Sequence, residues 1–230
     1  MSKEQRILIV DDDETTLDLL SMQLQSEGYQ VETASSGAEA LEFIKRRVPD
    51  LILLDLLMPD IDGLEVCRAV RAFSDVPIIV LSAVGLEDKK VEALDLGADD
   101  YLTKPIGVRE LKARVRVSQR RRDSKGRAAA GKVIRIGDLR LAFLQRQVTV
   151  AGREVHLTPT EYELLSELAR QRGRVVSHAE LLIRGWGPEY QESRNYLHVY
   201  MGRLRRKIGE AKGVEIVSEA GIGYVLKATA

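Results

Sequence analysis

The sequence has almost no cysteine and no long hydrophobic run. Cys67 is the single cysteine among 230 residues, which excludes an internal disulfide framework and a metal site built from several cysteines. We expect it to be a buried structural thiol. No apolar run approaches the ~18 residues that a membrane-spanning helix needs, and the opening MSKEQRILIVDDD reaches charged groups too early for a signal peptide. These absences predict a soluble cytoplasmic protein without a membrane partner.

An excess of charge of one sign is also lacking, but the zero net charge conceals two halves of opposite sign. The chain carries 35 Lys and Arg against 35 Asp and Glu. Residues 1–118 hold 14 basic and 23 acidic residues, net −9, which leaves 21 basic and 12 acidic residues, net +9, for the remainder. We therefore predict an acidic domain and a basic domain with different roles, of which the basic one meets nucleic acid.

The boundary between the two domains is predicted at residues 119–132. This stretch, QRRRDSKGRAAAGK, has no apolar periodicity and is rich in Arg, Ala and Gly, as linkers are. The first domain then covers residues 1–118 and the second covers residues 133–230. The basic linker is either a hinge or a contact to a phosphate backbone, and the sequence leaves both readings open.

The first domain alternates short apolar strands with segments of helical period. The predicted strands are 6–10, 30–34, 50–55, 77–82 and 99–103, and the predicted helices are 14–27, 36–47, 63–73, 86–96 and 107–118. Five such units predict an α/β, doubly wound, flavodoxin-like fold with a five-stranded parallel sheet. In such folds ligands bind at the carboxyl ends of the strands.

Reactive side chains gather at these strand ends. They are Asp11, Asp12 and Asp13 after the first strand, Asp55 after the third, Ser82 after the fourth and Lys104 after the fifth. Clustered carboxylates repel one another unless a cation lies among them, and oxygen ligands suit Mg²⁺. An aspartate that faces Mg²⁺, a lysine and a hydroxyl is placed to attack phosphorus, so Asp55 is predicted to become phosphorylated. Taken alone, Asp12 or Asp13 could instead cap the next helix.

Four segments resemble receiver domains of two-component response regulators: ILIVDDD, LILLDLLMPDIDG, IIVLSA and GADDYLTKP. The resemblance covers about residues 5–120. It implies the phosphoacceptor Asp55, the acidic pocket Asp11 and Asp12, Mg²⁺ contacts from Asp12, Asp55 and the backbone carbonyl of Leu57, the switch residues Ser82 and Tyr101, and Lys104 followed by a cis bond to Pro105.

Residues 1–118 contain no histidine, because His156, His178 and His198 all lie in the second half. The receiver would therefore take its phosphoryl group in trans, from a partner sensor histidine kinase or a small phosphodonor.

The second domain is predicted to be an α+β winged helix-turn-helix. Strands are expected in 133–143 and 147–157, helices at 158–173, 177–186 and 193–208, and a hairpin at 214–228. Thr158 is a candidate N-cap for the first of these helices, and Glu161 completes a capping box. The segments HLTPTEYELL, RLRRKI and GIGY resemble the effector domain of the OmpR/PhoB family. That resemblance implies that 193–208 is the recognition helix and that residues 184–193, with Trp186, meet RNA polymerase.

Helix 193–208 is expected to bury one stripe and to turn the opposite face to DNA. The core stripe is Leu197, Met201, Leu204 and Ile208. The DNA face is predicted to consist of Tyr196, Val199, Tyr200, Arg203, Arg206 and Lys207. A solvated basic face is the alternative. Family members often carry an arginine before the first glycine of the wing, where this chain has Glu219 and Ala220, so a minor-groove contact from the wing is not expected.

The resemblance also implies a dimer that forms on phosphorylation. Movement of Ser82 and Tyr101 would bias the surface of 86–96, 99–103 and 107–118 toward a two-fold contact. The implied pairs are Lys90 with Glu110, Asp95 with Arg116 and Asp100 with Arg114, around Val91, Leu94 and Ala113. Bridges within one chain are the alternative for these pairs.

These predictions describe a phosphorylation-activated transcription regulator that binds direct-repeat promoter sites, and not an enzyme. YLHVYMGRLRRKI and EAGIGY look most like the KdpE type, whose members control potassium-uptake operons. One alternative is a DNA-binding regulator whose receiver answers to a ligand or partner instead of phosphorylation. A phosphatase-type enzyme using the same aspartate is another, but it would leave the basic half unexplained.

Overall fold

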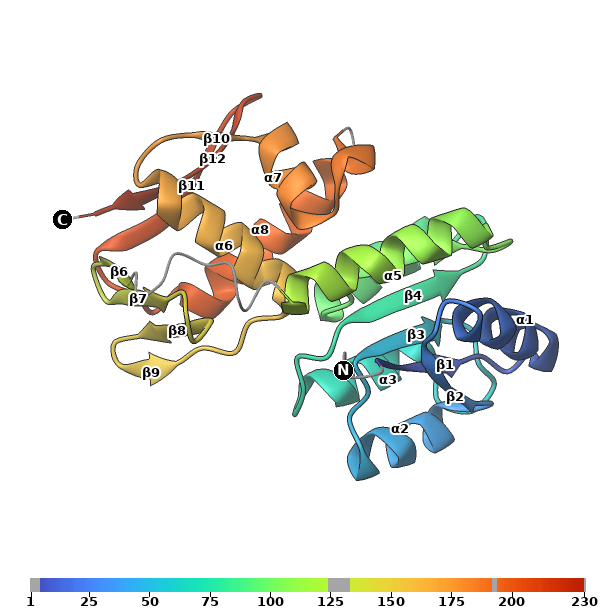
Figure 1. Cartoon of the computed structure of the whole chain (residues 1–230). Coiled ribbons are helices and arrows are strands. Elements are labelled where there is room, and N and C mark those ends of the chain that lie inside the picture. Colours follow the sequence, from blue (N-terminus) through green and yellow to red (C-terminus); the bar gives the residue numbers. More distant parts are fainter. Residues whose placement is uncertain (1–4, 124–132, 192–193, 230) are drawn as a thin grey trace. The chain divides into compact units, whose positions relative to one another are not determined.

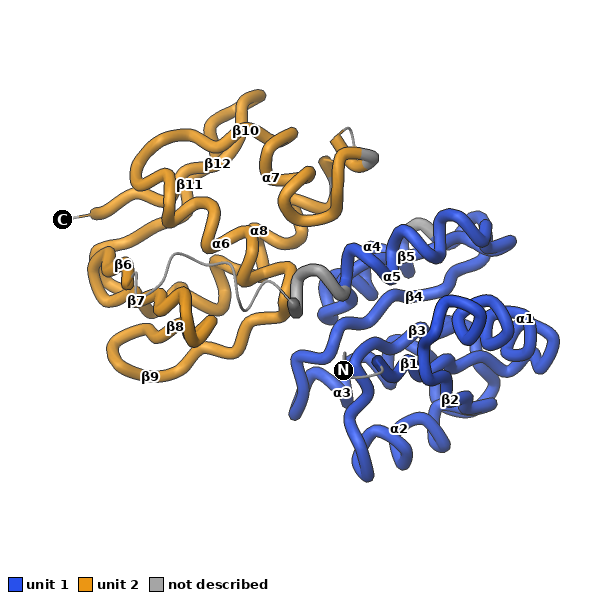
Figure 2. The backbone as a smooth tube through the Cα atoms, viewed as in Figure 1, with its two compact units in different colours: residues 1–118 blue, residues 119–230 orange. Residues whose placement is uncertain are grey.

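The chain forms two compact units, residues 1–118 and 119–230 (Figure 2). The computed structural model describes residues 5–123, 133–191 and 194–229. Residues 124–132 of the predicted linker therefore lie outside the described residues. Within the described ranges, no helix combines the length and the apolar character needed to cross a membrane.

The first unit is built on a five-stranded parallel sheet of order β2-β1-β3-β4-β5 (Figure 1). The strands are β1 (Arg6–Val10), β2 (Gln30–Ala34), β3 (Leu51–Asp55), β4 (Ile78–Ser82) and β5 (Asp100–Thr103). Every residue of β3 and β4 is buried, as expected for central strands covered on both faces. The predicted doubly wound sheet is confirmed, and β1 and β3 lie side by side although 40 residues separate them.

Five helices cover the two faces of this sheet. They are α1 (Glu14–Gln25), α2 (Gly37–Arg46), α3 (Gly63–Arg71), α4 (Glu87–Leu96) and α5 (Val108–Asp123). Leu17 and Leu24 of α1 share one apolar cluster with Leu111 and Val115 of α5. Helix α3 contacts both α2 and α4, and α2 lies on the other side of the sheet from α5 (Figure 1). Helix α5 ends five residues later than predicted, because its periodic pattern is followed by Arg and Gln, which are good helix formers.

The second unit has two antiparallel sheets around three helices. Its elements are β6 (Val133–Ile136), β7 (Leu139–Ala142), β8 (Gln147–Val150), β9 (Arg153–Glu154), α6 (Pro159–Gln171), β10 (Val176–Ser177), α7 (His178–Gly185), η2 (Pro188–Tyr190), α8 (Arg194–Ile208), β11 (Val214–Glu219) and β12 (Gly223–Ala228). The strand orders are β6-β7-β8-β9 and β10-β12-β11. The winged-helix prediction is confirmed, with β11 and β12 as the wing (Figure 1).

Local sequence signals explain where the helices begin. The Thr158 hydroxyl accepts a hydrogen bond from Glu161 N while the Glu161 carboxylate accepts one from Thr158 N, which is the predicted capping box of α6. Ser177 and Glu180 repeat the arrangement at α7. The two-residue strand β10 was not predicted, because its pairing with β12 depends on residues about 50 positions away.

Gly63 lies against the strand that carries Asp55. A Cβ atom at this position would lie 2.1 Å from Asp55 O and 2.8 Å from Leu56 Cα, both of which are backbone atoms. Only glycine therefore allows α3 to begin this close to the end of β3.

We predict that Gly63→Ala destabilises the first unit by about 2 kcal/mol, because overpacking shifts a buried backbone. Urea unfolding of the full chain, fitted with one transition for each unit, measures the loss. Gly107→Ala is the control, since its nearest contact would be Glu110 Cβ at 3.9 Å. If the urea midpoint of the first unit were unchanged in Gly63→Ala, the close contact between Gly63 and the end of β3 would not require glycine.

Candidate phosphoacceptor site and DNA-binding surface

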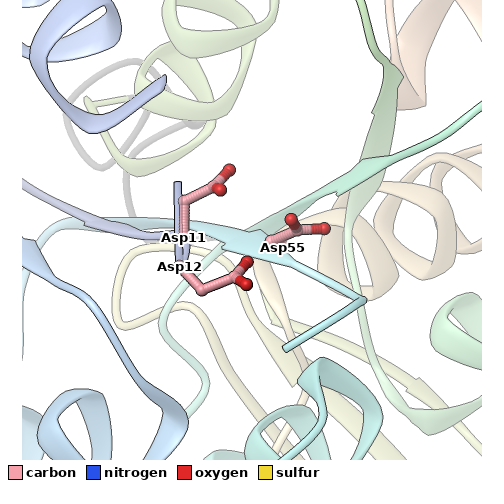
Figure 3. A group of neighbouring side chains, drawn as sticks. All are labelled: Asp11, Asp12 and Asp55. Carbon is pink, nitrogen blue, oxygen red and sulfur yellow. The ribbon is translucent and has the colours of Figure 1, made fainter. Parts of the chain in front are cut away.

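Three carboxylates meet at the carboxyl ends of β1 and β3. Asp11 and Asp55 are buried, whereas Asp12 is exposed. One oxygen from each of Asp11, Asp12 and Asp55 lies within 4.8 Å of the others. Figure 3 shows the three side chains at neighbouring strand ends. Because β1 and β3 are adjacent in the sheet, the fold brings together aspartates that are far apart in the sequence.

Lys104 provides the positive charge of this cluster. Its Nζ lies 2.8 Å from Asp11 Oδ2 and 2.6 Å from Asp55 Oδ2. The backbone N–H of Lys104 donates to Ser82 O at 2.8 Å, which places the residue at the end of β4 and β5. The peptide bond to Pro105 is cis, as predicted from the family resemblance.

The charges of this cluster are not balanced, which favours the binding of a metal cation. Burial raises the pKa of Asp11, and the nearby charge of Asp55 adds to the effect. Burial lowers the pKa of Lys104, but hydrogen bonds to Asp11 and Asp55 outweigh it and raise this pKa overall. Three carboxylates facing one ammonium form an oxygen-rich, net negative group, so the site fits a hard divalent cation.

Asp13 has a different role from its two neighbours. Its carboxylate accepts hydrogen bonds from Thr15 N at 3.1 Å and Thr16 Oγ1 at 2.7 Å, and it caps α1. The hydrogen bond from Thr16 is the main reason that the pKa of Asp13 is lowered. The capping alternative therefore applies to Asp13, and Asp12 is left at the acidic cluster.

The two expected switch residues lie on neighbouring strands. Ser82 is fully buried, and its hydroxyl donates to Ala83 O at 3.2 Å. Tyr101 is half-buried on β5, with Lys90 Nζ 5.0 Å from its ring centroid. Lys90 Nζ also donates to Thr103 Oγ1 at 3.1 Å, so the Lys90 side chain joins α4 to β5.

Residues expected at a dimer interface make contacts within the chain here. Arg114 pairs with Glu110 at 2.9 Å and with Asp100 at 3.7 Å. Val91 is exposed, whereas Leu94 is buried. The structure thus contains the intramolecular alternative for Arg114, and the partner pairs of a dimer remain a prediction.

Three of the six residues expected on the DNA face of α8 are buried in the second unit. Tyr196, Tyr200 and Arg203 are at most 4% exposed. The two tyrosine rings pack edge-on against Trp186, with centroid distances of 5.2 and 4.9 Å. Arg203 Nη2 lies 2.6 Å from Glu161, so its charge is used inside the domain. The buried face of α8 is therefore broader than the single stripe expected from the sequence, because Tyr196, Tyr200 and Arg203 lie directly beside that stripe.

The solvent-exposed surface of α8 differs in composition from the predicted DNA face. Arg206 and His198 are exposed, while Val199 and Gly202 are partly exposed. Lys207 is half-buried and bonds to Glu161 at 2.7 Å. Val199 and Arg206 belong to the predicted DNA face, whereas His198, which is exposed beside them, was not part of that prediction. Its spacing of four and eight residues from Gly202 and Arg206 is the signal that could have found it.

The loop between α7 and α8 is anchored by its aromatic residues. Trp186 is fully buried, and Tyr190 lies beside it and packs edge-on against Tyr196 at 5.3 Å. Trp186 therefore lies in the interior of the second unit and not on its surface. Among those residues of this loop whose side chains are described, Pro188 and Gln191 are exposed.

Two family models match the chain. The response regulator receiver domain matches residues 7–116, and the transcriptional regulatory protein C-terminal domain matches residues 152–226. The parallel sheet with its acidic cluster and the winged helix therefore define a response regulator, in which a receiver is joined to a DNA-binding domain. The chain belongs to the OmpR/PhoB family of transcription regulators.

Relatives of known name align over nearly the full length. The transcriptional regulatory protein KdpE of Mycobacterium tuberculosis is 41% identical over 224 residues, covering 96% of this chain and 99% of that protein. The KDP operon transcriptional regulatory protein KdpE of Escherichia coli is 41% identical over 95% of this chain and 97% of its own length. The response regulator MprA of Mycolicibacterium vanbaalenii is 43% identical over 97% of this chain and 98% of its own. A solved RitR mutant has a TM-score of 0.81 at 26% identity, covering 98% of this chain and 100% of that one.

We predict that Asp11→Asn raises the melting temperature of the first unit in the absence of metal, by roughly 4 °C for about 1 kcal/mol. The pKa of Asp11 is raised, so its charged form is disfavoured in the folded state. The gain should be largest at neutral pH and should shrink as the pH falls through the raised pKa toward 3.8.

Scanning calorimetry without divalent ions at several pH values is the measurement. Asp13→Asn is the control, and it should lower the melting temperature, because the pKa of Asp13 is lowered and its charge stabilises the folded state. A lower melting temperature for Asp11→Asn would show that the pair with Lys104 outweighs burial and repulsion.

Proposed function

We propose that this protein is a phosphorylation-switched transcription regulator in which Asp55 accepts a phosphoryl group from a sensor histidine kinase. One observation carries the proposal: the Asp55 carboxylate is held at 2.6 Å by Lys104, with Asp11 and the exposed Asp12 beside it. A nucleophile, a fixed ammonium and spare oxygen ligands in one place are the parts that phosphoryl transfer to aspartate requires.

In the proposed reaction a carboxylate oxygen of Asp55 attacks phosphorus. A new P–O bond forms as the P–N bond of a phosphohistidine breaks, or the P–O bond of a small phosphodonor, and the donor leaves with the electron pair. Lys104 offsets the negative charge of the transferred group. Mg²⁺ would be held by Asp11, Asp12, Asp55 and the backbone carbonyl of Leu57, and it would supply further charge stabilisation.

Phosphorylation would act on the α4, β5 and α5 surface through Ser82 and Tyr101. Thr103 pairs with Ser82 in the sheet, and Lys90 of α4 bonds to Thr103. A shift at Ser82 therefore has a short path to Lys90. In the proposed dimer the pairs across the two-fold axis are Lys90 with Glu110, Asp95 with Arg116 and Asp100 with Arg114, around Val91, Leu94 and Ala113.

The DNA contact is proposed for the open face of α8. His198, Val199, Gly202 and Arg206 would face a groove, and a dimer would place two such helices on direct-repeat half-sites. The exposed residues of the α7–α8 loop would meet RNA polymerase. A promoter of a potassium-transport operon is the proposed target, because two relatives carry the name KdpE. A regulator of this kind would act in the cytoplasm.

We predict that Asp55→Asn takes up no phosphoryl group from a small phosphodonor with Mg²⁺ and shows none of the gain in DNA affinity. Intact-mass spectrometry and a binding titration measure the two effects. The unchanged chain should gain about tenfold or more, because dimerisation raises the effective concentration of the second domain. Asp18→Asn, an exposed change on α1, is the control. A gain that persists in Asp55→Asn would favour a receiver controlled by a ligand or partner.

We predict that Arg206→Ala weakens binding to the target duplex by about 1–3 kcal/mol, the usual effect of removing a DNA-contacting arginine. His198→Ala should weaken it in the same direction. Fluorescence anisotropy at one stated salt concentration measures both. Arg172→Ala, an exposed arginine after α6, is the control. Equal affinities of the Arg206 variant and the control would remove α8 from the DNA contact.

A further inference from the structure

The carboxylate of Glu161 is fully buried at the start of α6, and three donors converge on it. Glu161 Oε2 accepts from Thr158 N at 2.8 Å and from Lys207 Nζ at 2.7 Å. Glu161 Oε1 lies 2.6 Å from Arg203 Nη2. One side chain therefore connects the first turn of α6 with two successive turns of α8.

The partners of Glu161 are themselves held in place. The Arg203 guanidinium lies 4.6 Å from the Tyr200 ring centroid, and Tyr200 packs against Trp186. Lys207 Nζ also donates to His156 O at 2.8 Å. Breaking an ion pair between a buried carboxylate and a buried guanidinium is costly, because each charge is then left in the protein interior without a partner. This buried group therefore resists movement of α8 relative to α6.

The Glu161 contacts restrict the rotation of α8 about its own axis. Arg203 and Lys207 are four residues apart, so they lie on one side of the helix. Gly202 and Arg206 precede them by one residue each, which is a rotation of about 100°. Turning α8 enough to present Arg203 or Lys207 to DNA would break the pairs with Glu161 and turn Arg206 away.

We propose that Glu161 is a positioning residue for DNA recognition. Through Arg203 and Lys207 it fixes which face of α8 meets DNA, so discrimination between sequences depends on a carboxylate that does not touch DNA. Arg203 and Lys207 act through this pairing and not as phosphate contacts. The inference rests on the proposed DNA-binding role of α8 and adds the group that sets its orientation.

Glu161→Gln is the first test, because it keeps the shape and the capping oxygen but removes the charge. The full chain first selects a duplex from a random library, and dissociation constants are then measured for that duplex and a scrambled one at equal salt. We define the specificity ratio as the dissociation constant for the scrambled duplex divided by that for the selected duplex. After correction for the folded fraction, this ratio should fall about tenfold in Glu161→Gln, which is the effect of one lost base contact. Binding to scrambled DNA should hardly change, since it depends on total charge.

Glu163→Gln is the matched control on the same helix. Glu163 is also ion-paired, but with Arg146 beside β8 at 2.9 Å and with Arg184 of α7 at 4.0 Å. The ratio should be unchanged in this variant. An unchanged ratio in folded Glu161→Gln as well would overturn the inference.

Lys207→Met provides the second test and covers the case in which Glu161→Gln does not fold. It removes one contact of Glu161 and keeps the pair with Arg203. A positioning role predicts a lower ratio with an unchanged slope of affinity against salt. A direct phosphate contact predicts the reverse, a constant ratio and a slope smaller by about one. If the unchanged chain selects no duplex at all, the proposed function fails; if it selects one and neither variant lowers the ratio, this inference alone fails.

Discussion

The ion pairs of Lys104 with Asp11 and Asp55 are the interaction on which the receiver site depends. They join the loop after β5 to the ends of β1 and β3, over lengths of 2.8 and 2.6 Å. Buried carboxylates are costly without partners. A single ammonium compensates them only in part, because Asp12 adds a third carboxylate. The site is therefore held together and still short of positive charge, which suits it to a metal cation, and such a cation would offset the negative charge of a transferred phosphoryl group.

The DNA-binding domain uses the same device for another purpose. Glu161 is buried and paired with Arg203 and Lys207, and no phosphorus chemistry is implied there. In the receiver, Lys104 compensates the negative charge of the three carboxylates only in part, and Asp12 is exposed to solvent. At Glu161 two cations and a backbone N–H surround the carboxylate, and in our proposal they fix the orientation of α8. Charge balance, and not residue type, separates the proposed phosphoacceptor Asp55 from the structural carboxylate of Glu161.

The sequence predicted the five strands of the receiver sheet, most helix starts and the gathering of Asp11, Asp12, Asp55 and Lys104, because these depend on local period, capping and the common edge of a parallel sheet. LILLD could be placed as a central strand and Asp55 at its end without any tertiary information. The face of α8 could not be predicted in the same way. Arginine is usually solvated, and the burial of Arg203 depends on Glu161, 42 positions earlier. Glu161 was recognised only as a capping residue, since the capping box is local and its other two partners are not.

In the proposed switch, the charge state of the acidic site controls binding to promoter DNA. The most direct measurement is capture of fragmented genomic DNA on the full chain with Mg²⁺ and beryllofluoride as a phosphoryl mimic, and in parallel without the mimic, at one salt concentration. The account predicts that direct repeats, including sites upstream of a potassium-transport operon, are enriched only with the mimic. Equal enrichment in both samples would contradict it, because DNA binding would then not await phosphorylation.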